Sequence, residues 1–219
     1  MIVAIDGPAG AGKSTVSRLI AERLGSVRID TGALYRAVAL AATRHDIPLT
    51  ATETLRPFVE HLAIELVGDR VLLDGEDVSQ AIRTPEISLA ASAYAAVPAV
   101  RAGLMELQRR LGRSAPSVMD GRDIGTVVFP DADVKLYLTA SADARADRRY
   151  RELVANGVAA TREDVLREIV LRDHQDMTRA VAPLRQAEDA TVIDATELSI
   201  EGTVGACLAA IRRVADARK

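Results

Sequence analysis

The chain has 219 residues, of which 48% are apolar and 3% aromatic, a formal net charge of −3 and a single cysteine. This size and composition favour one α/β domain, and the weakly acidic balance argues against a protein that coats nucleic acid through a basic surface. No apolar run approaches the roughly 18 residues of a membrane span, and no signal peptide is visible. The single cysteine, Cys207, cannot form an internal disulfide, which suits a reducing compartment. We therefore expect a cytoplasmic protein without a membrane or nucleic-acid partner.

The first elements in the chain are a short apolar strand and a glycine-rich loop. Residues 2–5 predict the strand, and Gly7, Gly12, Lys13 and Ser14 match the spacing G-x-x-x-x-G-K-[ST] of a phosphate-binding loop. In such a loop the backbone N–H groups surround a polyphosphate, the lysine reaches the β and γ phosphates, and the serine hydroxyl ligates Mg²⁺. The residues expected to bind a nucleotide triphosphate are Gly7, Pro8, Ala9, Gly10, Ala11, Gly12, Lys13, Ser14 and Thr15.

A helix is expected directly after this loop. Apolar residues recur at helical spacing from Val16 to Leu24, and Gly25 follows as a C-cap. A Gly/Ala-rich turn could match the loop pattern by chance, but the order of strand, loop and helix is the one that phosphate binding requires. We therefore interpret the N-terminal segment as a nucleotide-triphosphate site.

Residues 27–30 predict a second strand that leads into a helix, with Thr31 as the expected N-cap. Ligands of open α/β sheets bind where the strands end. Arg36, one turn into this helix, could therefore meet a second phosphate. The alternative is an ordinary capped helix on the surface.

The stretch from residue 51 to residue 88 interrupts the alternation of strands and helices. Two apolar runs on either side of a Gly-Asp turn predict a β-hairpin, so we interpret 51–88 as an inserted lobe. Residues 87–111 are expected to return to helix, with a break at Pro98. Ser92 and Arg101 lie on either side of this break, where plain surface positions are the alternative to a binding role.

A polar cluster follows the next predicted strand, residues 117–120. Asp120 ends this strand and could act on Mg²⁺ through water. The glycines of the following segment, 121–126, indicate that the backbone approaches a ligand closely. Arg122 and Asp123 either contact that ligand or form a local salt bridge or turn, and the phosphate loop upstream favours the first interpretation.

An arginine-rich pair of helices follows. Residues 134–138 predict a strand, residues 142–155 and 161–177 the two charged helices, and residues 190–194 and 198–215 a last strand and an amphipathic helix. Acidic residues are interleaved with the arginines, so a salt-bridged solvent face explains most of them. The candidates for facing a cleft are Arg148, Arg149, Arg172 and Arg179.

Strand candidates that alternate with helices indicate a parallel five-stranded sheet covered by helices on both faces. A phosphate loop, a second polar site and an arginine-bearing helical pair are what a phosphoryl transfer between two bound molecules requires. The rival interpretation is a nucleotide-hydrolysing switch or a nucleic-acid motor. The sequence lacks the Asn-Lys-x-Asp guanine motif, and it is small, acidic and without repeats.

Five stretches of the sequence, residues 7–13, 30–36, 120–130, 148–150 and 179–184, resemble the bacterial-type cytidylate kinases, nucleoside monophosphate kinases of the P-loop class. The GRDIGT and RAVAPL runs are highly specific, and the resemblance covers nearly the whole chain. It implies one P-loop kinase domain over residues 1–219, with a monophosphate-binding lobe at 51–88 and a helical lid at 142–179. It also implies a Mg²⁺-dependent transfer from ATP to CMP or dCMP in pyrimidine nucleotide metabolism; a kinase for another small acceptor is the runner-up.

The resemblance further implies roles at matched positions. The cytosine edge would be read by Ser92, Arg101 and Asp123. The acceptor phosphate would be held by Thr31, Arg36, Arg122 and Arg179, and its ribose by Arg172 and Asp176. The transferred phosphoryl group would be stabilised by Lys13, Arg122, Arg149 and Arg179, with the metal at Ser14 and Asp120. We expect a monomer.

Overall fold

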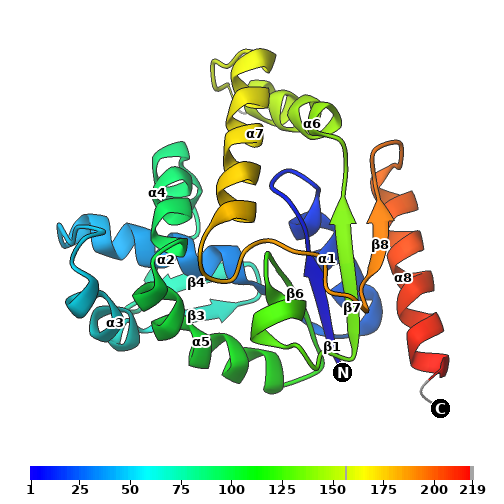
Figure 1. Ribbon diagram of the computed structural model, residues 1–219, viewed down its shortest axis with the longest axis horizontal. Helices are drawn as coiled ribbons and strands as arrows, with labels where there is room; N and C mark the ends of the chain where they lie inside the picture. Colours follow the sequence, from blue (N-terminus) through cyan, green and yellow to red (C-terminus); the bar gives the residue numbers. More distant parts are fainter. Residues whose placement is uncertain (156, 218–219) are drawn as a thin grey trace.

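The computed structural model of the protein describes residues 1–155 and 157–217. Its centre is a sheet of five parallel strands in the order β2-β6-β1-β7-β8, which confirms the predicted architecture (Figure 1). In the middle strand, Ile5 lies opposite Asp120 of one neighbouring strand and opposite Leu136 of the other. The strands are β1 (Ile2–Asp6), β2 (Val27–Asp30), β6 (Ser117–Gly121), β7 (Val134–Thr139) and β8 (Thr191–Asp194).

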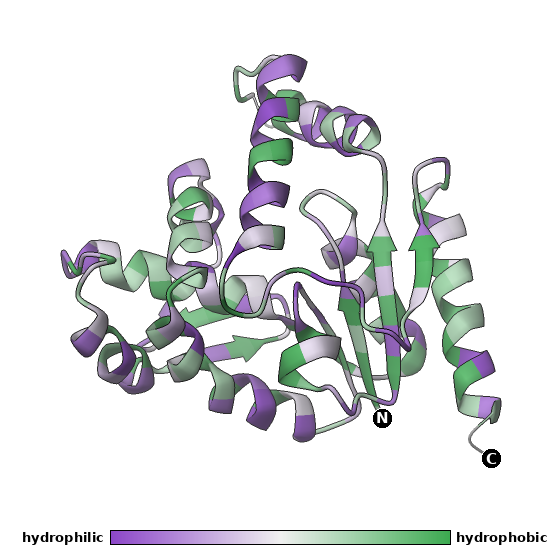
Figure 2. Ribbon diagram, viewed as in Figure 1, coloured by the Kyte–Doolittle hydropathy of each residue, from purple (hydrophilic) through white to green (hydrophobic). Residues whose placement is uncertain are grey.

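Both faces of this sheet are covered. Val3 and Ile5 point to one face and pack with apolar residues of α1 (Lys13–Leu24) and α8 (Ile200–Ala217). Ala4 points to the other face and packs in a cluster that includes residues of a π-helical turn, η2 (Ile124–Val128). Figure 2 shows the strands largely in hydrophobic colours, whereas the outer helices mix both kinds of residue. Continuous apolar runs of this kind are typical of parallel sheets that are buried on both sides.

The helices next to the sheet begin and end at residues with capping geometry. Gly25 ends α1 in the left-handed conformation, as predicted, and its N–H reaches the carbonyls of the last turn. The start of α2 (Thr31–Arg44) differs from the prediction, because Asp30 and not Thr31 is the N-cap. Asp30 keeps the extended backbone of β2 and its carboxylate accepts the N–H of Ala33 at 3.0 Å, whereas Thr31 is already helical.

The predicted hairpin is confirmed, as part of a second sheet. This sheet is antiparallel, in the order β3-β4-β5, and Gly68 takes a positive φ of 61° in the turn between its first two strands. This sheet and the helix α3 beside it lie in the left half of Figure 1. The elements are α3 (Thr52–His61), β3 (Ile64–Val67), β4 (Arg70–Leu73), β5 (Glu76–Asp77) and the short 3-10 helix η1 (Ala81–Arg83).

The predicted break at Pro98 separates two helices, α4 (Pro85–Ala95) and α5 (Pro98–Arg113), which meet at an angle of 97°. Pro98 is at the start of α5, where a residue without an N–H does not interrupt the helical hydrogen bonds. In the part of the chain that the structure describes, no single helix is long and apolar enough to cross a membrane. The bent α4–α5 pair meets that criterion only when the two helices are taken together, and only by length and composition.

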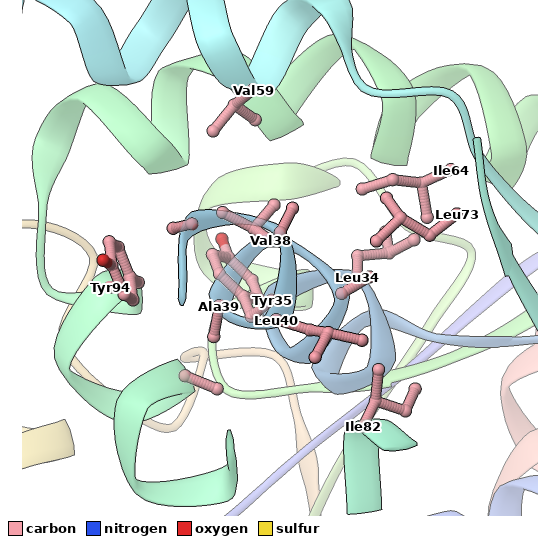
Figure 3. Packing of buried hydrophobic residues seen from close by; sticks show 14 of the residues in the cluster. Leu34, Tyr35, Val38, Ala39, Leu40, Val59, Ile64, Leu73, Ile82 and Tyr94 are labelled. Atoms are coloured by element: carbon pink, nitrogen blue, oxygen red, sulfur yellow. The ribbon is translucent and has the colours of Figure 1, made fainter. Parts of the chain in front are cut away.

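A single apolar core joins the second sheet to α2. Figure 3 shows Leu34 and Val38 of α2 among side chains from the surrounding elements, including Val59 of α3, Ile64 of β3 and Ile82 of η1. Residues of α4 and α5 belong to the same cluster. The segment 51–88 thus shares its core with the neighbouring helices, and its role as a separate lobe stays a prediction.

The arginine-rich helices pack against each other beyond the arrowhead of β7 in Figure 1. They are α6 (Ala142–Ala155) and α7 (Arg162–Thr178), and they pack through Ala146, Val165 and Ile169. Thr161 is the N-cap of α7, where its hydroxyl accepts the N–H of Asp164 at 3.1 Å. This small separate cluster is compatible with a lid, which stays a prediction.

Candidate active site

A cavity of about 910 Å³ lies at the carboxyl ends of β2 and β6, beside the loop that follows β1. Open α/β sheets bind their ligands at this edge, and small-molecule sites have volumes of about 300–1,000 Å³. Gly7 and Pro8 do not line the cavity. All other residues predicted for the site do: Ala9, Gly10, Ala11, Gly12, Lys13, Ser14, Thr15, Thr31, Arg36, Ser92, Arg101, Asp120, Arg122, Asp123, Arg149, Arg172, Asp176 and Arg179.

The glycine-rich loop has the backbone that its sequence predicts. Gly7 takes a φ of 152°, and a Cβ atom there would lie 1.9 Å from the backbone oxygen of Leu138, so the loop passes directly over β7. Gly10 and Gly12 also have positive φ, a conformation that glycine adopts without steric cost. Lys13 donates from Nζ to the carbonyl oxygen of Pro8 at 2.7 Å. Burial and the nearby charge of Arg122 hold the pKa of Lys13 well below its ordinary value.

The predicted metal ligands lie next to each other. The Ser14 hydroxyl donates to Oδ2 of Asp120 at 3.1 Å, and Asp120 is buried at the end of β6. Burial, reinforced by the negative charge of Asp30, raises the pKa of the Asp120 carboxyl. Mg²⁺ is usually held by one or two protein groups, with water and substrate phosphates completing an octahedron. One hydroxyl and one carboxylate beside a phosphate-binding loop fit that pattern. Among the described residues, no group of three or more His, Cys, Asp or Glu side chains is placed to hold a metal.

Two residues predicted to hold an acceptor phosphate extend from the start of α2. Arg36 donates from Nη2 to Oδ2 of Asp30 at 3.1 Å, so the N-cap carboxylate also orients this guanidinium. Thr31 donates its hydroxyl proton to the carbonyl oxygen of Asp120 at 2.8 Å. In this arrangement the Thr31 oxygen offers only lone pairs to a ligand, so of the two residues Arg36 is the one that can donate to a phosphate.

The residues predicted to read a base form a buried ion-pair network. Arg101 donates from Nη2 to Oδ2 of Asp123, and Arg179 donates to the other carboxylate oxygen at 3.3 Å. Both partners of the first pair are almost fully buried, at 3% and 4% exposure. The Arg101 guanidinium also lies 5.4 Å from the ring centroid of Tyr35, a cation–π contact. Side chains from α2 and α5 and from the segments that follow β6 and α7 therefore converge here, and Ser92 lines the same cavity from α4.

A second network comes from α7. Arg122 donates from Nε to Oδ2 of Asp176 at 2.8 Å. Burial alone would raise the pKa of Asp176, but the charges of Arg122, Arg172 and Arg179 hold it below its ordinary value. Burial and the like charge of Arg122 lower the pKa of Arg172 to about 10. Within the described residues, Nε of Arg172 is buried without a hydrogen-bond partner.

The remaining arginines of the helical pair separate into two groups. Arg148 and Arg149 line the cavity, as predicted; the first donates to the carbonyl of Ala195 and the second pairs with Glu152 at 2.9 Å. Arg162, by contrast, pairs with acids of α6 away from the cavity. A salt-bridged solvent face is therefore the structural role of Arg162.

Three charged residues that were not predicted as site residues support the site: Asp6 and Arg145 are buried, and Arg28 is half-buried. Asp6 accepts the N–H groups of Ile124 and Gly125 at 2.8 and 2.7 Å. Arg28 contacts Asp120, and Arg145 donates to the Ala9 carbonyl of the phosphate loop at 2.9 Å. A charge at the end or within a predicted buried strand, as at residues 6 and 28, is the sequence feature that could have drawn attention to them.

Known structures share this fold. The chain superposes on an uncharacterized protein from Eubacterium ventriosum ATCC 27560 with a TM-score of 0.52, at 10% identity and over 97% of this chain and 98% of that one. It superposes on a gluconokinase from Sinorhizobium meliloti 1021 with a TM-score of 0.50, at 15% identity and over 98% and 93% of the two chains. At such identities the likeness shows the fold alone.

Sequence relatives are much closer. The chain is 49% identical to a cytidylate kinase of Pseudomonas aeruginosa (strain UCBPP-PA14) over 93% of this chain and 91% of that one. It is 52% identical to a cytidylate kinase of Geobacter sp. (strain M21) over 92% of this chain and 88% of that one. It is 46% identical to a cytidylate kinase of Carboxydothermus hydrogenoformans over 99% of both chains. The family model described as cytidylate kinase matches residues 3–213. The chain therefore belongs to the cytidylate kinase family.

Proposed function

We propose that this protein transfers the γ-phosphoryl group of ATP to CMP or dCMP, which gives ADP and CDP or dCDP. The observation that carries the proposal is the single cavity in which a phosphate-binding loop faces the buried Arg101–Asp123 pair. The first feature suits a triphosphate donor and the second a polar base edge. The names of the relatives supply the cytosine, which the geometry alone does not specify.

The donor side would hold ATP through residues 7–15, whose backbone N–H groups (Pro8 has none) and Lys13 ammonium can donate to phosphate oxygens. Ser14 and Asp120 would hold Mg²⁺, which neutralises phosphate charge and orients the β and γ groups when bound. The chain's own contribution is to fix the triphosphate at the N-terminus of α1, where unpaired amides and the helix dipole favour an anion. Lys13 would exchange the Pro8 carbonyl for a phosphate oxygen, since both lie within reach of its flexible side chain.

The acceptor side would hold the monophosphate opposite the donor. Arg36, Arg122 and Arg179 supply guanidinium groups that match phosphate oxygens in a bidentate way. Arg122, Arg149 and Arg179 with Lys13 would stabilise the charge on the phosphoryl group during transfer, where positioning and charge neutralisation do most of the catalysis. Arg172 and Asp176 would contact the ribose. Thr31 would hold the acceptor phosphate once its hydroxyl proton turns from the Asp120 carbonyl to a phosphate oxygen.

The base would be read by Ser92, Arg101 and Asp123. A carboxylate accepts a hydrogen bond from the exocyclic amine of cytosine, and an arginine donates to its ring nitrogen and carbonyl oxygen. Uracil places a carbonyl where cytosine has the amine, which would leave Asp123 facing a second acceptor. Sites that lose a buried hydrogen bond in this way discriminate strongly.

We further propose that residues 51–88 are the monophosphate-binding lobe and that residues 142–179 close over the phosphates as a lid. Closure would exclude water, which competes with CMP as the phosphoryl acceptor. The small apolar cluster between α6 and α7, and the exposed ion pairs of Arg162, support a unit that moves as one body. Action as a cytoplasmic monomer on small nucleotides, without nucleic acid, is part of this proposal.

The test is ADP release from MgATP with CMP, dCMP, UMP, AMP, GMP or no acceptor. We expect strong turnover with CMP and dCMP and little without acceptor. Turnover with a different monophosphate would discard the roles of Ser92, Arg101 and Asp123 but keep the donor site. Fast turnover that needs no acceptor would contradict the proposal and identify a hydrolase or switch.

A further inference from the structure

The two carboxylate oxygens of Asp120 accept hydrogen bonds from different residues. Oδ2 accepts a hydrogen bond from the Ser14 hydroxyl of the phosphate loop at 3.1 Å. Oδ1 accepts from the Ser17 hydroxyl at 2.6 Å and from Nε of Arg28 at 3.3 Å. A side chain that is held through one oxygen presents the other in a fixed direction.

Arg28 is itself held in place from several sides. It comes from β2, the neighbour of β6 in the sheet, and its Nε also donates to the Ser17 hydroxyl at 3.0 Å. Its Nη2 donates to Asp30 at 3.2 Å, and its Nη1 lies 3.7 Å from Asp69. The planar guanidinium with its five donors can meet these partners together, which a lysine cannot do.

Burial of Ser17 and Asp120 limits the other positions that the Asp120 carboxylate can take. Ser17 is completely buried and Asp120 is 3% exposed, so water has little access to compete for Oδ1. Neither Ser17 nor Arg28 lines the cavity, so neither side chain is in a position to contact the substrates. Groups of this kind, which hold a ligand of a metal without touching the metal, set the direction of its lone pairs.

We propose that Ser17 and Arg28 are positioning residues that hold Asp120 with its Oδ2 beside Ser14, ready to bind the divalent cation of the donor nucleotide. The inference rests on the proposed function, since it concerns the metal that accompanies ATP. It adds two residues that the phosphate-loop pattern does not contain. It also separates a positioning pair from the ligands Ser14 and Asp120.

The two positioning residues differ in which substrate site they are connected to. Within residues 1–155 and 157–217, the Ser17 hydroxyl bonds to Asp120, to the backbone of Ser14 and to Arg28, none of which is predicted to bind CMP. Arg28 also pairs with Asp30, which orients Arg36 on the acceptor side. Loss of Ser17 should therefore affect the metal and leave CMP binding intact, whereas loss of Arg28 should affect both. A general loss of structure would not produce this division.

The experiment measures ATP affinity by calorimetry with excess Mg²⁺ and with EDTA, for the wild type, Ser17→Ala, Arg28→Lys and Arg28→Gln. Removal of an outer-shell partner typically costs roughly 10–100-fold in metal affinity, so we expect the strengthening of ATP binding by Mg²⁺ to shrink by about tenfold or to disappear in Ser17→Ala. Affinity for ATP in EDTA should stay unchanged. Arg28→Lys should retain more of the Mg²⁺ effect than Arg28→Gln.

Arg23→Ala is the matched control, because Arg23 lies on the same helix as Ser17 and its side chain forms an exposed ion pair with Glu201, away from Asp120. It should show the wild-type Mg²⁺ effect. Wild-type Mg²⁺ dependence in Ser17→Ala and Arg28→Gln would overturn the inference, as would an equal loss of ATP affinity in Mg²⁺ and in EDTA. No acceptor is present in this experiment, so its result is independent of whether CMP proves to be the substrate. KM for CMP, measured separately, should rise only in the Arg28 variants.

Discussion

Asp6 is the buried carboxylate whose replacement tests the electrostatics of the site most directly. It is 5% exposed at the end of β1 and accepts the N–H groups of Ile124 and Gly125, one on each oxygen. The segment that it holds follows directly after Asp123. The perturbation is Asp6→Asn, which keeps the size of the side chain, removes its titration and leaves only one oxygen to accept.

The expected effect follows from the pKa of Asp6, which rises from its ordinary value of 3.8 to about 6. Burial is the main cause and the charge of Asp123 adds to it, while the two N–H groups and Lys13 act in the opposite direction. Because the folded pKa is the higher one, the folded state binds an extra proton between the two values. The stability contributed by protonated Asp6 is therefore complete below pH 3.8 and lost as the pH rises through about 6.

One pKa unit corresponds to about 1.36 kcal/mol, so the full contribution is about 3 kcal/mol, of which about 2 kcal/mol lies between pH 7 and pH 4. The assay is urea unfolding of the wild type and of Asp6→Asn at both pH values. Other titrating groups act equally in the two proteins and cancel in the difference. We expect the wild type to gain about 2 kcal/mol relative to the variant at pH 4. A difference that stays the same at both pH values would refute the reasoning.

Two further comparisons use matched variants. Arg122→Ala and Arg179→Ala should lower kcat/KM by roughly 10–100-fold, since each removes charge-assisted hydrogen bonds, whereas Arg162→Ala should have little effect because Arg162 pairs with acids outside the cavity. Equal effects in steady-state assays would mean that the wrong face of the helical pair meets the cleft. Gly112→Ala places a Cβ 2.5 Å from the Phe129 ring and 2.7 Å from the Met119 sulfur, and overpacking of this kind costs roughly 1–3 kcal/mol. In Gly205→Ala, on α8, the added Cβ meets no atom within 4 Å, so the free energy of unfolding, measured by urea titration, should rise by roughly 0.5–1 kcal/mol. A Gly112→Ala variant as stable as the wild type would contradict the packing around Phe129.

The features that the sequence predicted well are those written in one contiguous stretch. The phosphate loop needs a strand, a run of glycines and a helix in that order, so its place at the end of β1 followed from the pattern of residues 2–24. The five-stranded sheet followed from the same kind of local reasoning, because buried parallel strands read as apolar runs between helices. The residues themselves also indicated Arg101, Arg122 and Asp123 as candidates, whereas the resemblance to known kinases added Asp176 and gave each position its role.

The features that it missed depend on contacts between distant positions. Asp6 meets a segment more than a hundred residues away, and so does Ser17 when it bonds to Asp120. Neither partner carries a mark of the other in its local pattern. The prediction of the N-cap of α2 was wrong for a different reason. Asp30 and Thr31 are both good capping residues, and only the backbone angles at the end of β2 decide between them.

The cations of the cavity show how these distant acids prepare the site for an anionic nucleotide. A buried cation is costly without a partner, and the protein supplies carboxylates for Arg36, Arg101, Arg122 and Arg179. These ion pairs fix the direction of each guanidinium before a substrate arrives, so little orientation is lost on binding. Arg172 is the exception, since among the described residues its guanidinium has no ion pair, while burial and the charge of Arg122 lower its pKa to about 10. An anionic oxygen of a bound nucleotide would offset the desolvation cost of the cation most at Arg172, because the other four arginines already face carboxylates. The paired arginines therefore contribute mainly geometry and Arg172 mainly attraction.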